Sequence, residues 1–180
     1  MGISNIHCIE ERRLKAKLKR KPFPLPRIQD TLQNLEGFNY AAALDLNMGY
    51  HHSRLSPEAQ DMCTIVTKFG LFKYKQLPMG VSCSPDIFQS KIFNLIGDIE
   101  GTKAYIDDIL VFKKGSFEEH LEQLDEVFRR CKKTGLKMNA EKCRFGLNEI
   151  DYLRYIVTPT GVKPNPKKIE AIKIDKDQPR

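Results

Sequence analysis

The chain has 180 residues, of which 41% are hydrophobic and 29% are charged. This is the size of one domain with an ordinary globular composition, which excludes a disordered polypeptide and a collagen-like fibre. The longest apolar runs span only a few residues, as in residues 109–112, so a membrane-spanning protein is excluded as well.

The net charge of +7 comes from one part of the chain. Residues 12–21 hold seven bases and no acid, and the remaining 23 bases equal the 23 acids. A local basic run suits a polyanion such as nucleic acid, and a solvated terminus explains it equally well. The five cysteines have no paired spacing, and the first residues contain no apolar signal core. These features predict reduced thiols and an intracellular protein, in the cytoplasm or nucleus, that is not secreted.

The first half of the chain predicts a short helix, a buried strand and a hairpin. The helix follows three closely spaced prolines, and Gly37 is expected to end it. Residues 40–46 predict a buried strand, and residues 62–67 and 71–76 predict the two strands of the hairpin. The apolar face of the short helix consists of Ile28, Leu32 and Leu35.

The second half predicts two longer helices around a second hairpin. Ser84 and Pro85 mark a helix start, with a capping hydroxyl followed by proline at the first helical position, and this helix ends near Gly97. Residues 104–112 predict the hairpin. The clearest helix runs from the capping box at Ser116 to Gly135. Its predicted apolar face consists of Phe117, Leu121, Leu124, Phe128 and Cys131.

Residues 150–157 predict a last strand, which is followed by a turn at residues 159–161. Strands paired locally and interrupted by helices are typical of an α+β fold. The simplest layering is an antiparallel sheet with helices packed on one face.

Two adjacent carboxylates, Asp107 and Asp108, interrupt the hairpin sequence at its turn. Two like charges so close raise at least one pKa unless a cation compensates them. Hard oxygen ligands select Mg²⁺ or Mn²⁺. For this pair on its own, an aspartate-rich turn without any ligand is the better explanation.

A third carboxylate changes this balance. Asp45 lies within an apolar stretch, where a lone unpaired charge is costly. If its strand lies beside the 104–112 hairpin, three carboxylates converge. Such a triad can hold two metal ions about 4 Å apart, which is the arrangement for in-line attack at a phosphate. The residues themselves therefore indicate metal-dependent phosphoryl transfer.

A series of ordered motifs between residues 22 and 172 resembles the reverse transcriptase of gypsy-type LTR retrotransposons. In chain order, the motifs are Leu44-Asp45-Leu46-x-x-Gly49-Tyr50-His51, Phe69-Gly70-Leu71-Phe72, Leu77-Pro78-Met79-Gly80, Pro85-x-x-Phe88-Gln89, Tyr105-Ile106-Asp107-Asp108, Gly135-Leu136-Lys137-Met138-Asn139, Glu141-Lys142-Cys143 and Tyr152-Leu153. The resemblance implies a polymerase palm with partial fingers over residues 22–157. Residues 1–21 would be a basic, truncated fingers segment, and residues 158–180 the start of the connection to a missing thumb.

The resemblance also implies an activity. It is that of an RNA-directed DNA polymerase, which transfers nucleotides from deoxynucleoside triphosphates to a primer 3′-OH on an RNA or DNA template with Mg²⁺ or Mn²⁺. Asp45, Asp107 and Asp108 resemble the family's catalytic metal ligands. The nucleotide-binding positions would be Leu46, Gly49, Tyr50, Gly80 and Gln89, and the nucleic-acid-binding positions Tyr105 and Lys137.

Several of these assignments have simpler explanations. Tyr50 resembles the gate that crowds a ribose 2′-OH, and a buried tyrosine with a satisfied hydroxyl explains it too. Gly80 also fits a plain turn, and Lys137 a surface lysine.

The chain departs from the family pattern in several places. The bases of an upstream fingers hairpin are missing from residues 1–9, Arg154-Tyr155 replaces a usual Gly-His pair, and Ser53 replaces an apolar residue. These departures leave two alternatives to an active polymerase. One is a non-catalytic nucleic-acid-binding relic of a degraded element, and the other is a metal-dependent nuclease that shares the carboxylates. The oligomeric state is not predicted.

Overall fold

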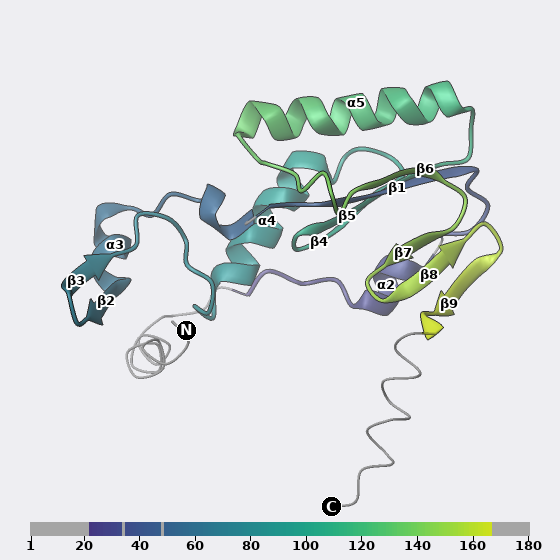
Figure 1. The fold of residues 1–180 in the computed structure, drawn as a ribbon. Coiled ribbons are helices and arrows are strands. Elements are labelled where there is room, and N and C mark those ends of the chain that lie inside the picture. Colours follow the sequence, from purple (N-terminus) through teal and green to yellow (C-terminus); the bar gives the residue numbers. More distant parts are fainter. Residues whose placement is uncertain (1–21, 34, 48, 167–180) are drawn as a thin grey trace, which may run out of the picture.

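A computed structural model describes residues 22–33, 35–47 and 49–166. The basic run at residues 12–21 lies outside the described residues. The centre of the fold is a four-stranded antiparallel sheet in the order β4-β5-β1-β6 (Figure 1). Its strands are β1 (Tyr40–Asp45), β4 (Thr102–Tyr105), β5 (Asp108–Lys113) and β6 (Arg144–Leu147). The predicted strand and hairpin at residues 40–46 and 104–112 are therefore confirmed.

The two central strands separate two apolar cores. Because side chains alternate along a strand, Leu44 and Ile109 face one core, whereas Ala41 and Leu110 face the other. Both faces of β1 and β5 are thus buried, which explains why their sequences are nearly continuous apolar runs. A charged residue can be accommodated only at the ends of such strands.

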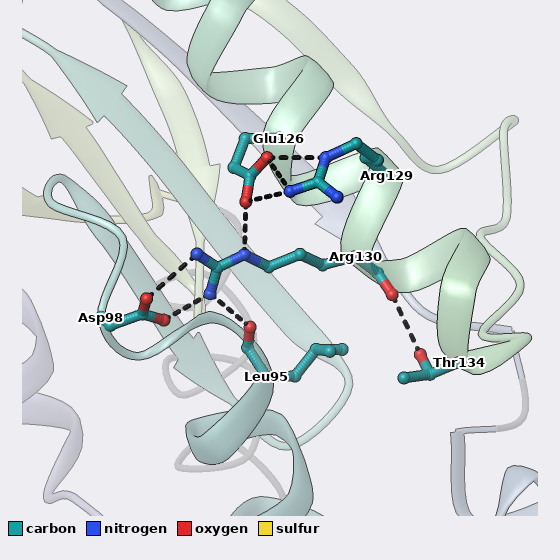
Figure 2. Close-up of polar contacts among 6 residues, drawn as sticks. All are labelled: Leu95, Asp98, Glu126, Arg129, Arg130 and Thr134. Atoms are coloured by element: carbon teal, nitrogen blue, oxygen red, sulfur yellow. Dashed lines mark hydrogen bonds and ion pairs between the residues drawn. The ribbon is translucent and has the colours of Figure 1, made fainter.

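Two long helices, α4 (Ser84–Ile96) and α5 (Phe117–Thr134), cover one face of this sheet (Figure 1). Arg130 of α5 joins the two helices, because its guanidinium donates to the Leu95 carbonyl oxygen at 2.9 Å and pairs with the Asp98 carboxylate (Figure 2). Glu126, one turn earlier on α5, accepts from both Arg129 and Arg130. The predicted α+β layering is confirmed.

The start of α4 differs from the prediction. The residue that precedes the helix is Cys83, and no side chain caps its first turn. The Ser84 hydroxyl instead donates to the Pro78 carbonyl oxygen at 2.8 Å. Ser84 is buried, so its hydroxyl satisfies a neighbouring loop rather than the helix, and the prediction of a serine cap was wrong.

Helix α5 begins with the predicted capping box and ends at Gly135, which has a left-handed conformation. Its buried face is shifted from the predicted one. Leu124 and Cys131 are buried as expected, but Phe117 and Leu121 are exposed. His120 and Val127 complete the buried stripe. A prediction from apolar residues at helical spacing does not include a histidine.

The opposite face of the sheet is covered by the short helix α2 (Ile28–Leu32) and by a three-stranded antiparallel sheet (Figure 1). The three strands are β7 (Ile150–Tyr152), β8 (Tyr155–Thr158) and β9 (Gly161–Pro164). The single strand predicted for residues 150–157 was wrong, because a turn at Leu153 and Arg154 divides it. Helix α2 ends at Leu32, before Gly37, whose amide donates to the Pro159 carbonyl oxygen instead.

A smaller lobe extends from one end of the central sheet (Figure 1). It contains the 3-10 turn η1 (Gly49–His52), helix α3 (Pro57–Met62) and the hairpin β2 (Thr64–Thr67) with β3 (Gly70–Lys73). The hairpin was predicted, with longer strands, but α3 was not. Its signal was present: the Ser56 side chain accepts from the Ala59 amide, and Pro57 occupies the first turn. In the described ranges, no helix has both the length and the apolar character needed to cross a bilayer.

The turn between β7 and β8 predicts a gain in stability on substitution. Leu153 and Arg154 both have positive φ, at 51° and 68°, a conformation that costs a residue with a side chain more than it costs glycine. Arg154→Gly should therefore raise the free energy of unfolding by about 0.5 to 1 kcal/mol, measured by urea denaturation. Glu149→Gly, in an exposed turn where φ is not positive, should lower it. An unchanged or lower stability of R154G would contradict this account.

Candidate active site

The three predicted carboxylates lie at one end of the central sheet. Pairing of β1 with β5 sets Asp45 directly opposite Asp108, at the last position of one strand and the first of the other. Asp107 precedes Asp108 in the two-residue turn that joins β4 to β5. The Leu46 amide donates to the Asp107 carbonyl oxygen at 2.9 Å, which continues the pairing beyond the strands. The structure thus brings Asp45 and Asp108 together, with Asp107 next to them in the chain, and their joint binding of metal ions stays a prediction.

The turn itself has an unusual backbone. Ile106, between Tyr105 and Asp107, has a φ of 53°, which is rare for a β-branched residue. The side chain of Gln89, on α4, bonds to both sides of this turn: its amide donates to the Ala104 carbonyl oxygen at 3.0 Å, and its oxygen accepts from the Ile106 amide at 2.7 Å. Predicted as a nucleotide-binding residue, Gln89 is thus bonded to the hairpin that carries the carboxylates.

The carboxylates lie where charge is costly. Burial raises the pKa of Asp107 to about 6, the negative charges of Asp108 and Asp45 add to this, and Lys142 opposes it. Burial and Asp45 raise the pKa of Asp108 as well. The Oδ1 atom of Asp107 is buried and has no hydrogen-bond partner. A buried carboxylate oxygen without a donor is the kind of atom that a bound cation satisfies.

Lys142 is a charged residue of this site to which the sequence reasoning gave no role. Its Nζ lies 3.4 Å from Oδ2 of Asp45. The two residues are 97 positions apart, so no spacing rule could pair them. The available signal was the Glu141-Lys142-Cys143 motif, which marks the segment without assigning the lysine a function.

The donor atoms of the site fit a hard divalent cation. Carboxylate oxygens from neighbouring positions are the ligands that Mg²⁺ and Mn²⁺ prefer, and the unpartnered Asp107 oxygen is available for one. As the side chains are placed, no group of three or more His, Cys, Asp or Glu residues within the described ranges forms a ready-made metal cluster. The ammonium of Lys142 contacts Asp45 instead.

The chain after β1 forms a wall against the carboxylates. A Cβ atom at Gly49 would lie 2.2 Å from Oδ1 of Asp107 and 2.4 Å from Cζ of Phe88, so only glycine fits there. The next residue, Tyr50, packs its ring against Phe88, with ring centroids 5.3 Å apart. Burial, followed by the charges of Asp107 and Tyr105, raises the pKa of Tyr50. Leu46 is buried, so only its backbone reaches the site.

The remaining predicted residues lie around this centre. Tyr105 is half-buried and pairs with Asp108 across the hairpin. Gly80 is exposed, with a φ of 93° that favours glycine. The side chain of Lys137 is exposed, while its carbonyl oxygen accepts from the Asn47 amide at 2.8 Å. Among the described residues, no hydrogen bond or ion pair joins the side chain of Lys137 to the carboxylates, so its role stays a prediction.

A cleft of about 360 Å³ opens beside the carboxylates, between β1, β6 and β7. Asp45 and Asp108 line it together with the bases Lys142 and Arg144. Acidic groups that can hold a cation therefore lie next to basic groups that can hold an anion.

Comparison with known proteins identifies the family. The profile described as "Reverse transcriptase (RNA-dependent DNA polymerase)" matches residues 3–157. The chain belongs to this reverse transcriptase family. It is 35% identical over 91% of its length to the Retrovirus-related Pol polyprotein from transposon 412 of Drosophila melanogaster, and 28% identical over 91% to that from transposon gypsy of the same organism. The reverse transcriptase of gypsy-type retrotransposon Pol polyproteins, expected from the motifs, is confirmed.

Solved reverse transcriptases have the same fold. The foamy viral protease-reverse transcriptase dRH in complex with double-stranded DNA superimposes with a TM-score of 0.88 at 23% identity, over 95% of this chain and 30% of that one. The foamy viral enzyme in complex with an RNA/DNA hybrid gives a TM-score of 0.79 at 23% identity, over 91% and 22%. The chain spans only 13% and 16% of the two Drosophila polyproteins, so it corresponds to a small part of each.

The raised pKa of Asp107 predicts that, in metal-free protein, its negative charge lowers the free energy of unfolding. A carboxyl group whose pKa is raised by folding destabilises the folded state as pH rises from about 4 through about 6. In EDTA, Asp107→Asn should therefore increase the free energy of unfolding at pH 7.5 by about 1 kcal/mol, after allowance for solvent screening. The gain should vanish at pH 4, where the parent carboxyl is protonated. Thermal denaturation at both pH values measures it.

The matched control is Asp125→Asn, on the exposed face of α5, which should change stability little at either pH. If D107N is less stable than the parent at pH 7.5, the Asp107 charge does not destabilise the folded state. The same conclusion holds if D107N gains as much stability at pH 4 as at pH 7.5.

Proposed function

We propose that this chain is the palm, with partial fingers, of an RNA-directed DNA polymerase that adds deoxynucleotides to a primer 3′-OH. The observation that carries the proposal is the pairing of Asp45 with Asp108 beside the buried, unpartnered oxygen of Asp107. Membership of the reverse transcriptase family supports the reaction class. Residues 22–157 would form the palm and partial fingers, with residues 1–21 as the basic fingers segment and residues 158–180 leading to a thumb.

In this proposal Asp45, Asp107 and Asp108 hold two Mg²⁺ ions, for which Mn²⁺ can substitute. Bound at that position, the ions supply charge neutralisation at the triphosphate and lower the pKa of the attacking hydroxyl. The protein contributes the fixed placement of the carboxylates. Since the pKa of Asp107 is about 6, this group is ionised, and able to act as a ligand, at neutral pH.

The residues that lie against the carboxylates indicate the substrates. Gly49 lets the backbone lie against the carboxylates, and Tyr50, held by Phe88, would crowd a ribose 2′-OH and select deoxynucleotides. Leu46 and Gly80 would lie beside the nucleotide, and Tyr105 and Lys137 beside the nucleic acid.

The primer and its template are the proposed partners. The foamy viral structures were solved with double-stranded DNA and with an RNA/DNA hybrid. The cleft beside Asp108 carries Lys142 and Arg144, which suit a phosphate backbone. Because the chain spans a small part of its relatives, we expect weak grip and low activity from it alone. Intracellular location stays a prediction.

The proposal predicts that each carboxylate is required for nucleotide addition. Asp45→Asn, Asp107→Asn and Asp108→Asn should each lower Mg²⁺-dependent primer extension at least 100-fold, because each removes a charged ligand. The measurement is single-turnover extension at low salt, with protein in excess over primer–template so that weak grip does not limit it. Asp125→Asn, on the exposed face of α5, is the control and should extend as the parent does.

The same assay separates the alternatives. Primer–template binding without incorporation by the parent would favour a non-catalytic relic, and cleavage without incorporation would favour a nuclease. Extension by D108N at the parent rate would contradict the assigned triad.

The position of Tyr50 predicts sugar selectivity. Tyr50→Val should raise the efficiency of ribonucleotide incorporation relative to deoxynucleotide incorporation at least tenfold, because it removes the ring expected to clash with a 2′-OH. The ratio of kcat/KM for the two nucleotides measures the effect. Tyr40→Val, in β1 at the far end from Asp45, is the control and should leave the ratio unchanged. An unchanged ratio in Y50V would remove Tyr50 from this role.

A further inference from the structure

The side chain of Gln89 is an unusual polar group in the core beneath the active site. It is 2% exposed and lies on α4, between the buried residues Phe88 and Ile92 of the apolar cluster. Both ends of its amide bond to backbone atoms of the carboxylate hairpin, at Ala104 and Ile106. A buried side-chain amide is retained only where its hydrogen bonds are made, and here both bonds go to this hairpin.

The residue that Gln89 holds has an unfavourable backbone. Ile106 has a φ of 53°, a conformation that is rare and unfavourable for a β-branched residue. Without a restraint, the turn would relax toward negative φ. The bond from the Ile106 amide to Gln89 is short, at 2.7 Å, and it acts on the strained residue itself.

Relaxation of Ile106 would move the carboxylate that follows it. The backbone of Asp107 is restrained at both ends. Ile106 precedes it, and its own carbonyl oxygen accepts a hydrogen bond from the Leu46 amide. Gln89 and Leu46 thus hold the two ends of a short segment whose only charged side chain is Asp107. This explains how its Oδ1 atom stays buried and unpartnered beside Gly49 despite the cost.

A direct contact of Gln89 with nucleotide or template is less consistent with this geometry. At 2% exposure, the side chain presents almost no surface to a ligand. A nucleotide could reach it only if the hairpin moved away, which would break both hydrogen bonds.

We propose that Gln89 is a positioning residue, which fixes the left-handed backbone of Ile106 and thereby sets the Asp107 carboxylate for the cation. The consequence for polymerisation rests on the proposed function, whereas the restraint on the hairpin does not. Gln89 therefore acts through Asp107 and not through the substrates.

The test replaces Gln89 by methionine, which keeps the length and apolar character of the side chain and removes both hydrogen bonds. In metal-free protein, amide hydrogen exchange of Ile106 should become about tenfold faster, while the amides of α5 keep their protection and report an intact fold. Mn²⁺ binding, followed by the EPR signal of the free ion, should weaken about tenfold. In primer extension, kcat should fall about tenfold while KM for the nucleotide changes less than twofold.

Two further variants make the result specific. Gln123→Met removes another glutamine, whose amide donates to the Glu100 carbonyl oxygen just before β4, and it should leave Ile106 exchange and Mn²⁺ binding unchanged. Gln89→Leu also removes both hydrogen bonds with an apolar side chain. It should show the same loss of Ile106 protection, and it replaces Q89M if that variant does not fold.

Slow Ile106 exchange and parent-like Mn²⁺ binding in Q89M would overturn the proposal. A rise in KM with unchanged kcat and Mn²⁺ binding would also overturn it and would place Gln89 on the nucleotide. If the parent neither binds Mn²⁺ nor extends primers, the proposed function fails, and the exchange experiment still decides whether Gln89 restrains the hairpin.

Discussion

The antiparallel pairing of β1 with β5 is the interaction on which the rest of the structure depends. It places Asp45 opposite Asp108 and, through the same ladder, divides the apolar residues of both strands between two cores. The helices α4 and α5 and the sheet β7-β8-β9 pack onto surfaces that this pairing creates (Figure 1). The acidic site is therefore a consequence of strand register, and the energy that maintains it comes from the apolar side chains behind it.

That energy opposes an electrostatic cost. Three carboxylates share one end of the central sheet, where burial and mutual repulsion raise the pKa values of Asp107 and Asp108, and Lys142 offsets only part of the repulsion. The close approach of Gly49 and the two bonds from Gln89 prevent the turn from relaxing. A cation bound there would relieve this repulsion, which is consistent with the proposed function.

Local sequence signals predicted the elements well where one signal dominated. The capping box and Gly135 gave the limits of α5, and the apolar runs gave β1 and the β4-β5 hairpin. The predictions were wrong where a tertiary contact decided the outcome: Ser84 bonds to Pro78 instead of capping α4, and His120 replaces an apolar residue in the buried stripe. The turn that divides residues 150–157 was missed because Leu153 and Arg154 lack the usual glycine of such turns.

In the site, the aspartates could be predicted from their apolar surroundings. The contact of Lys142 with Asp45 and the bonds of Gln89 could not, since both join residues distant in sequence.

The alternation of side chains in the paired strands makes the acidic site sensitive to the length of each strand. Many substitutions in the two cores would only loosen the packing. A single inserted or deleted codon within β1 or β5 is different, because it reverses which core each following residue enters and separates Asp45 from Asp108. Such a chain would still contain all three aspartates and all the motifs around them, although it could not assemble the same acidic site. The site therefore depends on the spacing between these residues as much as on their identity.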